Sequence, residues 1–94
     1  MKWSKQDQDK LILSYMGDAN REAVKAFYKF NGIIPLNELI SIAYENLVRA
    51  ARHYNPYQGM FWAYAQKRIR GALINRVKTY QDAPGLTIFP LHDR

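Results

Sequence analysis

A short turn in this chain places aromatic side chains directly before a helix rich in positive charge. Residues 55–72 read NPYQGMFWAYAQKRIRGA, so that tyrosines, a phenylalanine and a tryptophan precede the cations Lys67, Arg68 and Arg70. Unpaired bases stack on aromatic faces, and fixed positive charges attract the phosphates that link those bases. This combination of residue types predicts a surface that binds single-stranded nucleic acid.

The net positive charge of the chain arises in its second half. The formal net charge is +6, yet the first 45 residues hold six acidic and six basic side chains. Residues 46–81 contain no aspartate or glutamate, but they contain seven cations: Arg49, Arg52, Lys67, Arg68, Arg70, Arg76 and Lys78. This distribution favours an anionic binding partner over an incidentally basic surface.

Other classes of protein lack support in the sequence. The chain has no cysteine, and its two histidines, His53 and His92, are too far apart in the sequence to form a metal cluster alone. No carboxylate pair, nucleophile–base set or glycine-rich phosphate loop is present, so we expect neither an enzyme nor a cofactor. No long apolar run is present, which predicts a cytoplasmic protein without a membrane partner.

Capping and breaking residues divide the chain into helices. Ser4 and Asp7 match a capping box, Gly17 is expected to end the first helix, and Asn31-Gly32 the second. The predicted helices cover residues 5–16, residues 18 or 20 to about 30, 35–54 and 60–80. The expected fold is all-α, a compact bundle of about four helices with short connections and a short extended C-terminal tail. Residues 1–82 are assigned to this domain and residues 83–94 to a linker or tail.

A helical wheel divides the last predicted helix into two faces. Centred on Ile69, the inner face holds Trp62, Ala65, Ala72, Leu73, Arg76 and Tyr80. The outer face holds Tyr64, Lys67, Gly71, Ile74 and Lys78, with Phe61, Arg68 and Asn75 along one border and Arg70 on the other. We expect the inner face to pack against the bundle and the outer face to meet a ligand.

Several of these residues have more than one interpretation. Trp62 is expected to pack, whereas for Tyr64 base stacking and packing both stay open. Gly71 indicates either close helix packing or close approach of a ligand, and its outward position favours the ligand. Tyr54 and Tyr57 are expected to wedge the turn in place. The acidic residues Asp18, Glu22, Glu38 and Glu45 are interpreted as helix caps and surface charge.

Three linked motifs resemble region 2 of the bacterial sigma-70 family. They are residues 29–40 (KFNGIIPLNELI), residues 50–56 (AARHYNP), and Gly59 followed by residues 61–65 (FWAYA) and 68–74 (RIRGALI). The resemblance extends over about residues 19–80. Sigma subunits of this family direct RNA polymerase to the promoter −10 element and help to open it.

The resemblance implies two working surfaces. A docking face for the clamp coiled coil of core RNA polymerase would comprise Glu38, Ser41, Ile42, Glu45, Val48 and Arg49. A second surface would bind the non-template single strand of promoter DNA, with Phe61 and Tyr64 capturing a flipped adenine. It would also include Lys67, Arg68, Gly71, Ile74 and Asn75. Apart from the resemblance, the positive charges of Arg70 and Lys78 on the same helix are expected to attract DNA phosphates.

The chain departs from the family pattern at several positions. Lys67 and Arg68 replace the tryptophan pair of housekeeping members, as in alternative sigma factors. Ser41 and Ile42 replace a glutamine and a glutamate, and the loop before Phe61 is one residue shorter than in many members. Residues 87–93 (TIFPLHD) resemble the start of the linker that leads to the −35-binding domain.

The predicted function is therefore that of a transcription initiation factor domain of the alternative sigma type. One alternative is a sigma-like co-factor that works with a partner protein supplying −35 recognition, and an anti-sigma factor is a further possible partner. A basic DNA-binding bundle that acts without polymerase ranks lower.

Overall fold

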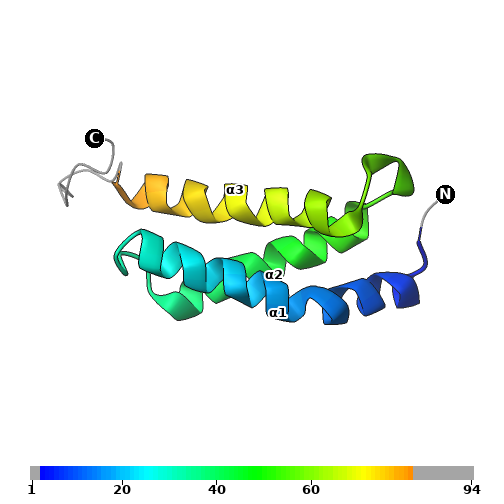
Figure 1. Cartoon of the computed structure of the whole chain (residues 1–94), viewed down its shortest axis with the longest axis horizontal. Helices are drawn as coiled ribbons and strands as arrows, with labels where there is room; N and C mark the ends of the chain where they lie inside the picture. The colour runs from blue at the N-terminus through cyan, green and yellow to red at the C-terminus, as the bar shows by residue number, and fades with distance from the viewer. Residues whose placement is uncertain (1–2, 82–94) are drawn as a thin grey trace.

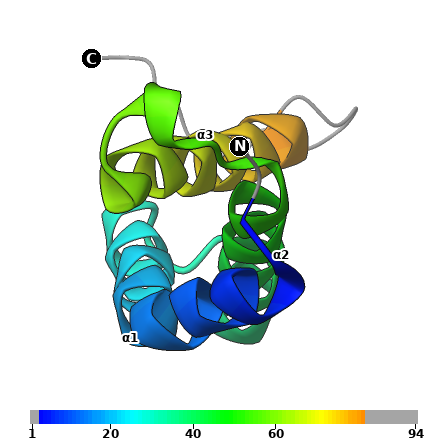
Figure 2. The same cartoon turned by 90° about the vertical axis from the view of Figure 1, so that its right-hand side faces the viewer.

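Three helices make up the described part of the chain. In this computed structural model, which describes residues 3–81, α1 spans Lys5–Lys29, α2 Leu36–His53 and α3 Phe61–Gln81, with a short 3-10 helix, η1, at Pro56–Gln58. α2 runs antiparallel to both α1 and α3, and the three helices surround a shared core (Figure 1, Figure 2). The all-α prediction is confirmed. The predicted tail at residues 83–94 lies outside the described residues.

The first two predicted helices are one continuous helix, so the expected total of four is wrong. The predicted capping box is present, because the Asp7 amide donates to Ser4 Oγ over 3.1 Å and Asp7 accepts from the Ser4 amide. The helix then continues through Gly17, because Ile12 and Ala19 on either side of it are buried in the core. Packing of α1 over its full length offsets the cost of one glycine, about 1 kcal/mol.

The ends of the helices follow the sequence more closely. Asn31 and Gly32 have φ angles of 57° and 68°, and they end α1 in the left-handed conformation that the sequence predicted. α2 begins directly after Pro35, whose carbonyl accepts from the amides of Glu38 and Leu39. The end of α2 at His53 and the start of α3 at Phe61 lie within one residue of the predicted bounds.

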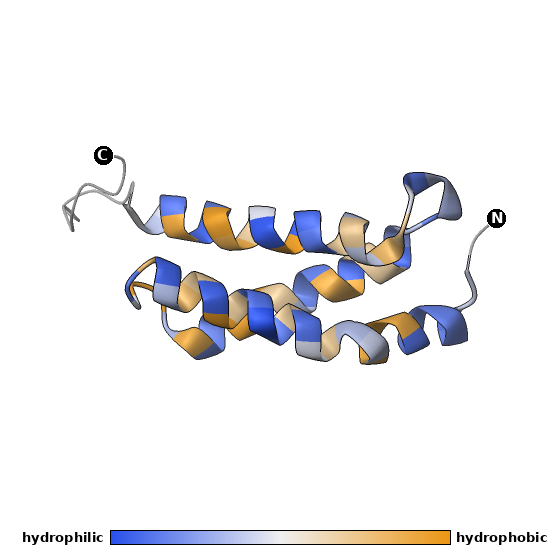
Figure 3. Ribbon diagram, in the orientation of Figure 1, coloured by the Kyte–Doolittle hydropathy of each residue, from blue (hydrophilic) through white to orange (hydrophobic). Residues whose placement is uncertain are grey.

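α2 forms the centre of the bundle, because it packs extensively against both other helices while α1 and α3 meet over fewer residues. α2 turns one apolar stripe into the core, where Leu39, Ala43, Leu47 and Ala50 are buried. Each helix carries both hydrophobic and hydrophilic bands, as expected for helices with one side in a core and one in water (Figure 3). This arrangement leaves one side of α2 and one side of α3 facing outward.

Candidate nucleic-acid interface

The turn between α2 and α3 is fixed by hydrogen bonds from its own residues. The Asn55 side chain accepts from the Tyr57 amide over 2.8 Å, and the Gln58 side chain accepts from the Asn55 amide over 2.9 Å. Gly59 has a φ of 86°, a conformation that residues with a side chain rarely adopt. Tyr54 is buried, and its hydroxyl donates to the Gly59 carbonyl over 2.6 Å. The predicted wedge role of Tyr54 is therefore confirmed.

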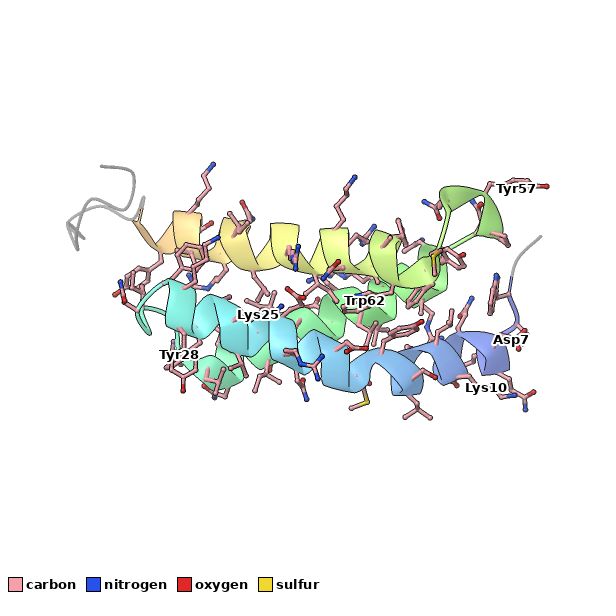
Figure 4. The ribbon with its side chains drawn as sticks, viewed as in Figure 1. Asp7, Lys10, Lys25, Tyr28, Tyr57 and Trp62 are labelled. Carbon is pink, nitrogen blue, oxygen red and sulfur yellow. The ribbon has the colours of Figure 1, made fainter. Side chains whose placement is uncertain are left out.

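Tyr57 does not wedge the turn, so that expectation is wrong. Its side chain is 92% exposed and projects away from the three helices at the tip of the turn (Figure 4). The caps from Asn55 and Gln58 already hold the backbone, so the turn needs no contact from this ring. Met60, three residues later, is 80% exposed. The turn thus presents a tyrosine ring and a thioether to solvent.

Phe61 is buried rather than available to a ligand, which corrects the sequence-based expectation. It is 7% exposed, and its ring contacts the ring of Tyr54 edge-on at a centroid distance of 5.2 Å. The ring of Tyr15 from α1 lies on another side of it at 5.4 Å. Phe61 therefore has no open face on which a base could stack.

The helical wheel misplaced Phe61 because the buried stripe of α3 winds around the helix. The buried residues recur at every fourth position: Phe61, Ala65, Ile69, Leu73 and Val77. Four residues turn an α-helix by about 40° more than one full revolution, so the two ends of this stripe point in directions far apart. A wheel centred on Ile69 therefore describes the middle of α3 correctly but misplaces Phe61 at its start.

Trp62 and Tyr64 occupy positions between the core and the surface. Trp62 is partly buried and stacks on Tyr15 of α1, with ring centroids 5.3 Å apart and planes inclined by 5°, so its predicted packing role is confirmed. Tyr64 is also partly buried, and its ring lies against Tyr54 at 5.9 Å. The Tyr64 hydroxyl accepts from Arg68 over 3.4 Å. Part of the Tyr64 ring is therefore already in contact with the protein.

The outer side of α3 carries the residues that the wheel predicted there, except Tyr64, which is partly buried. Lys67, Gly71, Ile74, Asn75 and Lys78 are all exposed, and we call this set the α3 strip. A Cβ atom added at Gly71 would meet nothing within 4 Å. Close helix packing therefore does not explain this glycine, which leaves the ligand interpretation in place.

Most cations of the acid-free stretch are paired with acids from the first half of the chain. Arg70 lies 2.9 Å from Glu22, Arg52 lies 3.2 Å from Asp9, Arg49 lies 2.7 Å from Glu45, and Arg76 bonds to Glu38. Within residues 3–81, the cations of this stretch without an ion pair are Lys67, Arg68 and Lys78. The tertiary structure thus narrows the charge available to a ligand to the outer side of α3.

Glu22 lies at the centre of a polar network, so its interpretation as a surface charge is wrong. It is 6% exposed, and it accepts hydrogen bonds from Arg70 of α3 over 2.9 Å and from Gln66 over 3.0 Å. Burial raises the pKa of Glu22, but the bonds from Arg70 and Gln66 and the charges of Arg70 and Lys25 together lower it below the ordinary 4.5. The bond to Glu22 raises the pKa of Arg70. Arg70 therefore links α3 to α1 through its ion pair with Glu22.

The predicted polymerase-docking residues lie along α2, with different degrees of exposure. Ser41, Glu45 and Arg49 are exposed and recur every fourth residue, which places them along one side of the helix. Ile42 and Val48 are partly buried, and Glu38 is drawn toward Arg76. Tyr44 is 45% exposed close to Ser41 and Glu45 in the helix, and sequence reasoning did not single it out.

Comparisons with known proteins return no match: no family model fits this chain, and no curated protein or solved structure matches it. None of the helices within residues 3–81 has both the length and the apolar character needed to cross a membrane. In the same part of the chain, no three His, Cys, Asp or Glu side chains lie close enough together to hold a metal ion.

Proposed function

We propose that this chain is a transcription initiation factor domain that docks on RNA polymerase through α2 and binds the melted −10 element through α3. The observation that carries the proposal is the α3 strip. It presents two lysines without ion pairs, an exposed isoleucine and an unobstructed glycine in a segment without acids. Such a surface attracts phosphates and lets a strand approach the helix backbone closely.

The aromatic contribution falls to Tyr57 and Tyr64, because Phe61 is buried. Tyr57 lies in the turn that leads into α3, and Tyr64 lies one helical turn before Arg68. Unstacking and flipping a base costs a few kcal/mol, and each base stacked on an aromatic ring returns about 1–3 kcal/mol. Two rings offset that cost only approximately. The domain alone should therefore bind single strands weakly and leave duplex DNA closed, with polymerase supplying the remaining free energy.

Reversing one exposed charge on α2 tests the docking face. Arg49→Glu should abolish or strongly reduce capture of core RNA polymerase, because like charges brought together across an interface cost several kcal/mol. The measurement is a pull-down with purified core enzyme. Arg21→Glu is the matched control, since Arg21 is also an exposed arginine that is ion-paired within its helix, on α1.

Arg21→Glu should retain polymerase as well as the parent chain does. If the parent chain fails to capture core polymerase, or if both variants behave alike, docking through α2 is wrong. Capture of polymerase without binding of a −10 single strand would instead support the sigma-like co-factor.

Two glycine substitutions separate stability from DNA binding. Gly71→Ala and Gly17→Ala should each raise the free energy of unfolding by about 0.5–1 kcal/mol, because both glycines are helical and an added Cβ would meet nothing. Only Gly71→Ala should weaken binding of a single-stranded −10 oligonucleotide several-fold, since its methyl group would stand between α3 and the strand. Urea unfolding and fluorescence anisotropy measure the two effects. Equal DNA binding by both variants would show that Gly71 does not contact the strand.

A further inference from the structure

A pocket opens where the end of α1 passes the middle of α3. Its volume is about 340 Å³, within the range of clefts that hold small ligands. Lys25, Lys29 and Phe30 line it from α1 and its C-cap, and Arg70, Leu73 and Ile74 line it from α3. The buried Glu22 also lines this space, which we call the seam pocket. It exists because α1 and α3 meet over fewer residues than either meets with α2.

The charge of the seam pocket is positive toward solvent. Glu22 is already satisfied by Arg70 and Gln66, and its distance to Lys25 Nζ is 4.0 Å, at the limit of an ion pair. The Lys25 side chain is 59% exposed, and it lies on the side of α1 that faces α3 (Figure 4). The Lys29 ammonium group lies 5.6 Å from the centre of the Phe30 ring. Two lysines are therefore placed to contact an anion entering from solvent.

The remaining lining of the pocket is apolar. Leu73 is buried at the base of this lining, and the partly buried Phe30 and the 45% exposed Ile74 offer hydrophobic surface to a ligand. A ligand that matches this lining combines a flat apolar part with a negative charge. A nucleotide has both, in its base and its phosphate, and Ile74 already belongs to the α3 strip.

We propose that the seam pocket holds one nucleotide of the bound single strand, with its base against Phe30 and Ile74 and its phosphate at Lys25 and Lys29. The proposal rests on the proposed function, and it extends the DNA-binding surface from α3 onto α1. An acidic segment of a partner protein would match the lysines, but it would not need the apolar side chains of Phe30 and Ile74 in the pocket.

Three charge-neutralising variants test the proposal against a fluorescently labelled single-stranded oligonucleotide over a series of salt concentrations. Lys25→Gln with Lys29→Gln removes the two pocket lysines. Lys5→Gln with Lys10→Gln makes the same change in net charge near the start of α1 (Figure 4). Lys10 lies 15 residues from Lys25, or about 22 Å along the helix, which is beyond the screening length of about 10 Å at 0.1 M salt. Lys67→Gln with Lys78→Gln tests the α3 strip itself.

The pocket variant should make the slope of log affinity against log salt shallower by about 0.7, since the pocket holds one phosphate and each neutralised phosphate contributes about 0.7 on single strands. The Lys5 and Lys10 control should leave the slope unchanged. If only the Lys67 and Lys78 variant alters the slope, the seam pocket is wrong while the proposed function stands. If the oligonucleotide binds neither the parent chain nor any variant, the seam pocket and the proposed function are both wrong.

A second comparison tests whether a base lies against Phe30 in the pocket. Phe30→Leu keeps an apolar side chain but removes the ring, so it should weaken binding of a thymidine oligonucleotide several-fold and leave an abasic strand of the same length unaffected. Equal effects on both strands would overturn the placement of a base in the pocket. Displacement of the oligonucleotide by a glutamate peptide of equal charge, at equal concentration, would also overturn it in favour of a protein partner.

Discussion

Replacement of Phe61 by alanine should lower the free energy of unfolding by about 3–5 kcal/mol, the usual cost of deleting a buried phenylalanine side chain. The ring joins all three helical segments near the turn, because it packs between Tyr15 of α1 and Tyr54 at the end of α2. Urea denaturation followed by circular dichroism measures the change. A loss of DNA binding in this variant would then reflect unfolding rather than a missing stacking partner.

The conservative variant Phe61→Leu distinguishes the two roles. It preserves most of the apolar volume, so it should cost about 1.5 kcal/mol or less and leave single-strand binding at the level of the parent chain. A base-stacking role for Phe61 predicts the opposite result, weaker DNA binding in a fully stable protein. A Phe61→Ala variant as stable as the parent would contradict the buried position of this ring.

Replacement of Glu22 by alanine should destabilise the fold by about 1–3 kcal/mol at neutral pH, because it removes an acceptor of buried, charge-assisted hydrogen bonds. Arg70 and Gln66 of α3 would lose the contact that ties them to α1. Glu45→Ala is the matched control, since its ion pair with Arg49 is 58% exposed on both side chains. It should change stability by about 1 kcal/mol or less.

The effect of Glu22 should also depend on pH. Its pKa is lower in the folded protein than the ordinary value of 4.5, so folding favours the ionised form. The stabilisation is complete above the ordinary value and disappears as the pH falls through the lower, folded value. Lys25, Arg70 and Gln66 are the charged and polar groups that face this carboxylate. The difference in unfolding free energy between the parent and Glu22→Ala should therefore shrink with acidification, and a difference that grows instead would contradict the network.

The local features of this fold could be predicted from sequence because they depend on neighbouring residues. The Ser4 and Asp7 capping box, the left-handed Asn31 and Gly32, and the ends of α2 and α3 involve contacts over a few positions. The continuity of α1 through Gly17 could not be predicted in the same way. It depends on the burial of Ala19 and Ala23 against other helices, which outweighs the local preference of glycine.

Only part of the candidate interface could be predicted from sequence, because some of its features are local and others depend on packing between helices. The exposed positions of the α3 strip follow from helical periodicity near the centre of α3. The burial of Phe61 and the exposure of Tyr57 depend on how the winding apolar stripe and the capped turn meet the other helices. Glu22 carried no local signal of burial, since its partners Gln66 and Arg70 lie more than forty positions away in the sequence.

The amino-acid sequence by itself determined an all-α fold, its caps and turn, and the absence of acidic residues from residues 46–81. Only the tertiary structure decided which of those cations can meet a ligand. Acids on neighbouring helices neutralise Arg52, Arg70 and Arg76, whereas Lys67 and Lys78 project from α3 without ion pairs within residues 3–81. The reason is physical: composition fixes the total charge of a segment, but ion pairing depends on distances that exist only after the helices have packed together.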